Sequence, residues 1–353
     1  ELLRSADSAE QNVFVPPVGG QGFWGLDFGS LFASNHKLDA VRRYSPPPIE
    51  GVITDTTTAY QEILNGVNGP RGIALDTGNA LWVAVATAPA ATGAKTARLV
   101  RYTEFAGGWS SSTVLSAALN DPAAFVFQEG NNLGHLWVAN RGGSGANASI
   151  VKFENTGTSP SPAFSNANAS TFTTHSQLSQ PTGLAFDQAG NLVVAASAAG
   201  RIFVYPNTGS GVIGTSTSTT LTALASPFAV TVDNNGNLYA ANNPSGPSGF
   251  GSLWRFANQG SAGAPNLSTT PVRLQDNVDL AAIGFDGGGT LWGTEFNVSR
   301  VIKLSSAPPA APQQFGNLSG RLSYEGSVGA GPFRIVFTKD PFLRAGQPTI
   351  TVS

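Results

Sequence analysis

Four polar residues at one recurring position could together hold an ion or a ligand. They are Asn35, Asn140, Asn242 and Glu295, and each closes a short apolar run that is typical of a β-strand. Amide and carboxylate oxygens are the hard ligands that Ca²⁺ prefers. If these strand ends meet around one axis, the sequence predicts a binding site there, with Glu295, Asn140 and Asn242 as candidate metal ligands.

Further charged residues are expected beside these strand ends. His36 and Arg141 directly follow two of them, and Arg71 is expected to begin a strand at the same end. Asp27 stands where other copies of the repeat have small residues. A buried carboxylate without a partner is costly, so Arg71 is its candidate partner. The candidate ligand-binding set is Asp27, Asn35, His36, Arg71, Asn140, Arg141, Asn242 and Glu295.

Three interpretations of this ring stay open from the residues alone. The ring binds a ligand or ion without catalysis, or it holds a metal that polarises a carbonyl while Asp27 or Glu295 assists as a base. In the third interpretation, Asn at a strand end only satisfies backbone groups. No catalytic residue is assigned, because the sequence has no Gly-X-Ser-X-Gly, phosphate-loop or His-Glu-X-X-His motif.

The elements that position these residues are copies of one hairpin. Residues 181–196 comprise an alternating strand, a turn rich in Asp, Gly and Asn, and a second apolar strand. Residues 70–84 and 228–242 repeat this pattern. The Leu that opens the second strand recurs at intervals of 46 to 56 residues, as Leu31, Leu81, Leu136, Leu192, Leu238 and Leu291.

Six such units predict an all-β fold, a six-bladed β-propeller followed by a short β-rich C-terminal segment. A four-stranded blade cannot bury both faces alone, whereas packing around an axis buries them. We expect the propeller to span 23–304. A Pro/Ala linker at 305–315 is then followed by a β-rich segment at 316–353, which is either part of a sandwich or an assembly arm.

The N-terminal region is expected to close the ring. Within 1–22, Asn12–Val15 is predicted to supply the missing fourth strand of the last blade, and the alternative is a disordered tail. In the first unit, residues 23–28 are expected to be the first strand and Gly51–Thr54 the fourth.

The repeat resembles the NHL type. The pattern Pro-X-Gly-Ile/Leu-Ala-Leu/Phe-Asp, then Gly-Asn-Leu-Trp/Val-Val-Ala, is clearest around Asp76, Asp187 and Asp233 and covers about 24–304, while Gln128 replaces the turn Asp in one unit. The resemblance implies a fold shared by scaffolds, binding modules and a minority of enzymes, so it implies no activity. A Glu with three Asn is also similar to the divalent-cation site of six-bladed lactonase-type propellers. That likeness implies a bound Ca²⁺. For a non-catalytic binding module, we expect no cofactor.

Some residues that could do chemistry are expected to be structural. Asp233–Asn237 looks like a calcium loop, but turn geometry explains it, and His135 precedes a strand start. Four aromatic residues share one repeat position and should pack between blades rather than form a sugar-stacking platform: Trp82, Trp137, Tyr239 and Trp292.

The composition restricts the partners. Charged residues make up 11% of the 353 residues and the net charge is −2, without a basic run for nucleic acid. No apolar run approaches the roughly 20 residues that span a bilayer. The absence of Cys excludes disulfides and thiolate metal sites.

We predict a secreted module of bacterial type that binds or assembles outside the cell or at its surface without catalysis. The start at Glu1, without an initiator Met, indicates processing. The charge-poor surface favours other protein chains or neutral glycans, and the C-terminal segment favours self-assembly. The alternative is a metal (Ca²⁺)-dependent lactonase-type hydrolase, or a lyase, with its site at the channel mouth.

Overall fold

The computed structural model describes residues 10–14, 31–35, 39–44, 52–54, 61–65, 67, 69–76, 80–85, 97–106, 108–128, 134–142, 148–158, 162–173, 178–217, 219–243, 251–285, 289–295, 300–304, 335–338 and 349–352. These residues are β-strands and their connections, apart from one 3-10 turn, η1 (Asn166–Asn168). In this described part, a helix with the length and apolar character needed to cross a membrane is not found.

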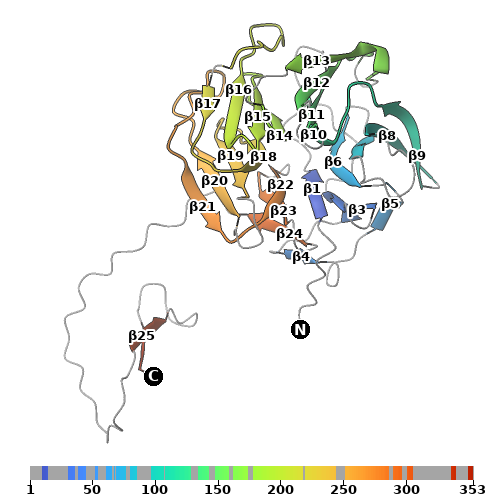
Figure 1. Cartoon of the computed structure of the whole chain (residues 1–353). Helices are drawn as coiled ribbons and strands as arrows, with labels where there is room; N and C mark the ends of the chain where they lie inside the picture. Colours follow the sequence, from blue (N-terminus) through green and yellow to red (C-terminus); the bar gives the residue numbers. More distant parts are fainter. Residues whose placement is uncertain are drawn as a thin grey trace, which may run out of the picture. The chain divides into compact units, whose positions relative to one another are not determined.

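Six four-stranded antiparallel sheets surround one axis and form a six-bladed β-propeller (Figure 1). Blade 1 is β1 (Glu10–Phe14), β2 (Leu31–Asn35), β3 (Ala40–Tyr44) and β5 (Gln61–Asn65), and blade 2 is β6 (Pro70–Leu75), β7 (Leu81–Val85), β8 (Arg98–Phe105) and β9 (Gly108–Leu115). Blade 3 is β10 (Pro122–Phe127), β11 (Leu136–Asn140), β12 (Ser149–Phe153) and β13 (Ala169–Thr173), and blade 4 is β14 (Pro181–Phe186), β15 (Leu192–Ala196), β16 (Arg201–Tyr205) and β17 (Thr219–Leu221). Blade 5 is β18 (Pro227–Val232), β19 (Leu238–Asn242), β20 (Ser252–Phe256) and β21 (Val272–Asp276), and blade 6 is β22 (Leu280–Phe285), β23 (Leu291–Glu295), β24 (Arg300–Leu304) and β4 (Val52–Thr54). In each blade the first strand named is the innermost, and these six strands contact one another around the ring.

Ring closure differs from the prediction for Asn12–Val15. β1 pairs with β2 as the innermost strand of blade 1, so it does not complete the last blade. The strand that completes blade 6 is β4, which pairs with β24, and β5 takes the outer place in blade 1 that was expected for Gly51–Thr54. These strands are short, and their places in the sheets are set by distant pairing partners rather than by their own residues. Residues 23–28 lie outside the described residues.

The core lies between the blades. β7, β11, β15, β19 and β23 are buried along their whole length, because both faces of each blade are covered by its neighbours. Their aromatic residues are buried with them, and Trp82 is 0% exposed. The prediction that these rings pack between blades is confirmed. None of the four is an exposed stacking platform: Trp82, Trp137, Tyr239 and Trp292.

The innermost strands approach one another at a position that requires a small residue. A Cβ added at Gly72 would lie 3.0 Å from Cα of Ala124, and one added at Gly183 would lie 2.9 Å from the carbonyl oxygen of Phe228. These neighbours are backbone atoms of the next blade, so they cannot turn away as a side chain can. The Gly of the Pro-X-Gly pattern is therefore a packing requirement.

The acidic residue of the hairpin turn holds the turn together. Oδ1 of Asp233 accepts the backbone N–H groups of Asn235 and Asn237 at 2.9 and 2.8 Å. Its Oδ2 accepts the side-chain amide of Asn237 at 2.8 Å and the hydroxyl of Tyr239 at 3.1 Å. Turn geometry therefore accounts for Asp233–Asn237, as expected.

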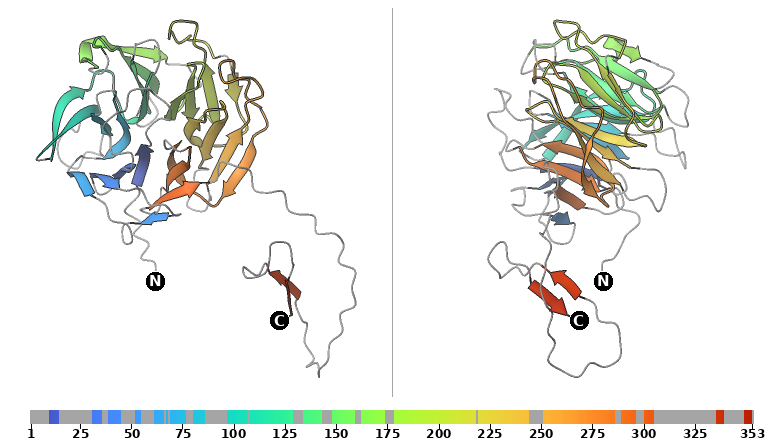
Figure 2. Two further views of the ribbon diagram at one scale, coloured as in Figure 1. Left: turned by 180° about the vertical axis from the view of Figure 1, so that it is seen from behind. Right: turned by 90° about the vertical axis from the view of Figure 1, so that its left-hand side faces the viewer.

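Residues 310–353 form a second compact unit. Its described strands, β25 (Ile335–Thr338) and β26 (Thr349–Val352), pair antiparallel (Figure 2). The expected linker at 305–315 lies outside the described residues.

Candidate functional site

The predicted ring of strand ends lies at one end of the propeller, which we call the mouth end. Here the innermost strand of each blade begins and the antiparallel strand beside it ends. The pairing places Asn140 opposite Pro122 in blade 3 and Asn242 opposite Pro227 in blade 5. Glu295 closes the corresponding strand of blade 6 and is 4% exposed.

The side chains of Asn140 and Asn242 serve the backbone of their own blades. Oδ1 of Asn140 accepts the N–H of Asn120 at 2.6 Å, and its Nδ2 donates to the carbonyl of Ala118 at 3.3 Å. Oδ1 of Asn242 accepts the N–H of Ser226 at 2.8 Å. Both oxygens thus accept from the loop that leads into the innermost strand. This arrangement agrees with the interpretation in which Asn at a strand end satisfies backbone groups.

The other predicted members are placed less completely. The backbone of Asn35 ends β2, whereas its side chain, together with Asp27 and His36, lies outside the described residues. The proposed pairing of Asp27 with Arg71 therefore stays a prediction. Within the described ranges, no group of three or more His, Cys, Asp or Glu side chains is placed to hold a metal ion.

The structure brings Arg71 and Arg141 together on Asp121, a residue that sequence reasoning missed. Nη2 of Arg71 lies 3.2 Å from Oδ1 of Asp121, and Nε of Arg141 lies 3.3 Å from Oδ2. Arg71 belongs to blade 2 and Asp121 immediately precedes β10 of blade 3, so the cluster joins two blades. The backbone of Asp121 also accepts the N–H of Arg141 at 3.1 Å, which holds these two residues side by side.

Burial of the cluster affects the pKa of Arg71. Burial lowers the pKa of Arg71 to about 10; Asp121 opposes this change and Arg141 adds to it. The guanidinium is still charged at neutral pH. The distances to Asp121 are those of ion pairs without hydrogen-bond alignment. Nε and Nη1 of Arg71 are buried and have no hydrogen-bond partner among the described residues. Two guanidiniums share one carboxylate, so the cluster carries an excess positive charge.

Arg71 occupies the bulge that follows the first residue of the innermost strand. Such a bulge recurs in blades 3 to 6, with the residues Ala123, Thr182, Phe228 and Ala281 at this position. Of these, Arg71 is the one that brings a charge to the mouth end. Its carbonyl accepts a hydrogen bond from the hydroxyl of Ser34, which ties it to blade 1 as well.

A signal for Asp121 was present in the sequence. It directly precedes the Pro that opens an innermost strand, as Gln180 does in the next blade. Both residues have positive φ, of 64° and 48°, a conformation that Asp tolerates better than most residues. The contact with Arg71 was not readable, because it depends on the packing of two blades.

Solved structures with the same fold include several β-propellers of known name. A putative gluconolactonase is 14% identical, with a TM-score of 0.53, covering 84% of this chain and 89% of that one. A streptogramin B lyase is 16% identical, with a TM-score of 0.50, covering 79% and 76%. A chain of a nidogen/laminin complex is 17% identical, with a TM-score of 0.46, covering 65% and 72%. No protein-family model and no curated protein matches the sequence.

At these identities the likeness shows the fold alone. The chain is a six-bladed propeller, and two of its structural neighbours bear the names of a putative gluconolactonase and a lyase. A shared fold does not assign a function, so the side chains of this chain must do so. The resemblance to the NHL type stays a prediction from the repeat residues.

Proposed function

We propose that this chain is a non-catalytic binding module of the extracellular space or cell surface, built on an NHL-type six-bladed propeller. Its site is the mouth end beside Arg71, and its partner is a protein chain that presents a carboxylate. The carrying observation is Arg71, whose side chain is 14% exposed and whose Nε and Nη1 are buried without an acceptor among the described residues.

An unsatisfied buried donor costs about 1–3 kcal/mol, and more in a charged group. A carboxylate can take two parallel N–H bonds from one guanidinium, so it supplies the missing acceptors in one step. Arg141 stays beside Asp121 and keeps that carboxylate neutralised while Arg71 turns to the partner. The mouth end therefore favours an anionic group.

The metal-dependent hydrolase or lyase receives less support from this geometry. Two of its three candidate ligand atoms, the side-chain oxygens of Asn140 and Asn242, already accept backbone N–H groups. In the same region, the unsatisfied groups of Arg71 are donors and attract an anion rather than a cation.

The test compares a peptide acid with its amide. Isothermal titration at low ionic strength should give saturable binding of triglycine and binding at least about tenfold weaker for triglycine amide, because a charge-assisted bidentate bond is lost. Arg71→Gln should remove the preference for the acid. Arg273→Gln is the matched control, since Arg273 is 54% exposed, pairs with neighbouring Asp276 and lies over the Trp254 ring of blade 5.

Equal binding of the acid and the amide, or an acid preference that survives Arg71→Gln, would overturn the proposal. Weaker binding of the acid at higher salt, with Arg71 intact, would support it, because salt screens the attraction between charges, although less for partly buried pairs.

A further inference from the structure

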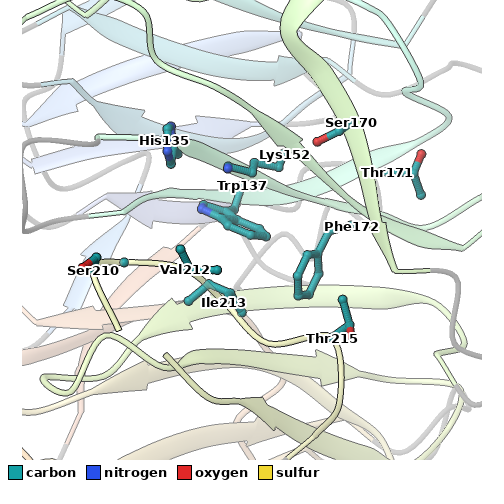
Figure 3. A pocket seen from close by; sticks show the side chains of 11 residues that line it. His135, Trp137, Lys152, Ser170, Thr171, Phe172, Ser210, Val212, Ile213 and Thr215 are labelled. Carbon is teal, nitrogen blue, oxygen red and sulfur yellow. The ribbon is translucent and has the colours of Figure 1, made fainter. Parts of the chain in front are cut away.

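A cavity of about 460 Å³ lies between blades 3 and 4, away from the residues of the mouth end. β12 and β13 of blade 3 form one wall, and the loop after β16 of blade 4 forms the other (Figure 3). Its lining includes His135, which lies just before β11 begins, at the end of blade 3 opposite the mouth end.

One departure from the repeat builds this cavity. Gln128 stands where other units have the turn Asp, and its Oε1 accepts the indole N–H of Trp137 at 3.0 Å. Its Nε2 donates to the carbonyl of Gly211, in the loop of blade 4. An Asp could accept from Trp137 but could not donate to Gly211. The amide thus ties the loop to blade 3 and fixes the second wall.

Part of the cavity lining is apolar. Trp137 and Phe172 meet edge to face with ring centroids 4.9 Å apart, and Ile213 packs against the same cluster. Val212 is 60% exposed beside them. Figure 3 shows Trp137 between Lys152 and the Val212–Ile213 segment. Trp137 is 2% exposed, so the apolar surface open to a ligand group is that of Val212 and the partly buried Phe172.

The charged and ring groups of the lining are donors. Lys152 Nζ lies 5.7 Å from the centre of the Trp137 ring, over its face. Nδ1 of His135 already accepts the N–H of Asn155 at 3.1 Å, which leaves Nε2–H as the remaining polar group of that ring. Among the described residues that line the cavity, the other polar side chains are hydroxyls and none is Asp or Glu. Lys152 pairs with Glu154 at 3.1 Å, but Glu154 is 56% exposed and such surface pairs are weak.

We propose that this cavity binds a small carboxylate with an aromatic or branched apolar body. The apolar body of the ligand lies against Phe172 and Val212, beside the buried Trp137. Its carboxylate replaces Glu154 as the partner of Lys152 and reaches the donors at the rim. This site is independent of the one at Arg71, because it needs the apolar body as well as the charge.

The experiment is isothermal titration of the full chain with phenylacetate, phenylacetamide and acetate. Phenylacetate should bind at one saturable site, and both other probes at least about tenfold more weakly, because each lacks one of the two interactions. Lys152→Gln should abolish the preference for the acid over the amide. Val212→Glu should remove phenylacetate binding by placing a carboxylate at an exposed position in the cavity.

Two variants serve as controls. Lys303 lies across the strand pair from Trp292, as Lys152 lies across from Trp137, so Lys303→Gln should leave phenylacetate binding unchanged. Arg71→Gln should also leave it unchanged, which separates this site from the mouth end. Absence of saturable phenylacetate binding, or binding that persists in both Lys152→Gln and Val212→Glu, would overturn the proposal.

Discussion

The backbone N–H of Asn155 donates to Nδ1 of His135 at 3.1 Å. The same bond recurs in the next two blades with Asn as the acceptor, from Asn207 to Asn191 at 2.8 Å and from Asn258 to Asn237 at 2.9 Å. His135 therefore replaces an Asn of the repeat and has a structural role, as the sequence predicted. The bond requires Nδ1 to be unprotonated, which makes the turn of blade 3 sensitive to pH.

Acid should weaken blade 3 through His135. Burial lowers the pKa of His135, nearby Lys152 lowers it further, and Glu154 opposes both. The unfolded chain has a His pKa of about 6.5 and so binds the proton at higher pH than the folded chain. The stabilising contribution is thus complete above about pH 6.5 and is lost as the pH falls through the lower folded pKa. Urea unfolding at pH 7.5 and 5 should show this loss.

His135→Asn is the matched variant, because its Oδ1 can accept the same N–H without titrating near neutral pH. It should keep the stability at pH 7.5 and lose this part of the pH dependence. His135→Ala should cost about 1 kcal/mol at pH 7.5, through loss of the hydrogen bond. If His135→Asn and the unchanged chain had parallel pH profiles, the assigned role would be wrong.

The repeated architecture was readable from the sequence because its determinants are local. The alternating strands, the turn residues and the spacing of the anchoring Leu all lie within one hairpin. One local signal was overlooked. A five-residue motif occurs at 153–157, 205–209 and 256–260. It consists of an aromatic residue, a variable residue, Asn, then either Thr or Gln, and finally Gly. In each copy the Asn side chain accepts the N–H two residues later, which organises the following loop.

The features that the sequence did not predict depend on contacts between blades. The choice of β4 to complete blade 6, the Arg71–Asp121 pair and the bond from Gln128 to Gly211 all join residues from different repeats. Gln128 was recognised as a departure from the pattern, but nothing nearby in the sequence indicated what its amide would bind. Asn140 and Asn242 were placed at the correct end, whereas the orientation of their amides required the loop structure.

The turn of blade 2 should depend strongly on the charge of Asp76. This carboxylate is 1% exposed and accepts the indole N–H of Trp82 at 2.9 Å and Nε of Arg101 at 2.7 Å. Asp76→Ala should lower the free energy of unfolding by about 3–5 kcal/mol, because it leaves Arg101 without its buried partner. Asp276→Ala, at a 55% exposed position, is the control and should change it by less than about 0.5 kcal/mol. Similar effects of the two substitutions in urea unfolding would contradict this account.

The close approach of the innermost strands should make Gly183 intolerant of even one methyl group. Gly183→Ala places Cβ within 2.9 Å of a backbone oxygen in blade 5 and should cost about 1–3 kcal/mol by overpacking. Gly263→Ala adds a methyl group where nothing lies within 4 Å, so it should be close to neutral. Thermal melts of the two variants provide the comparison. A melting temperature for Gly183→Ala equal to that of Gly263→Ala would show that the blades separate easily there.

Calcium tests the metal interpretation of the mouth end directly. The side-chain oxygens of Asn140 and Asn242 already accept backbone N–H groups at 2.6 and 2.8 Å, so these residues should act as loop supports rather than metal ligands. Melting temperatures in calcium and in chelator should therefore agree. Asn140→Ala should lower stability by about 1–3 kcal/mol in both, because the N–H of Asn120 loses its acceptor. Stoichiometric calcium in the purified protein, with a melting shift that Glu295→Gln abolishes, would instead restore the ion site and the enzyme hypothesis that depends on it.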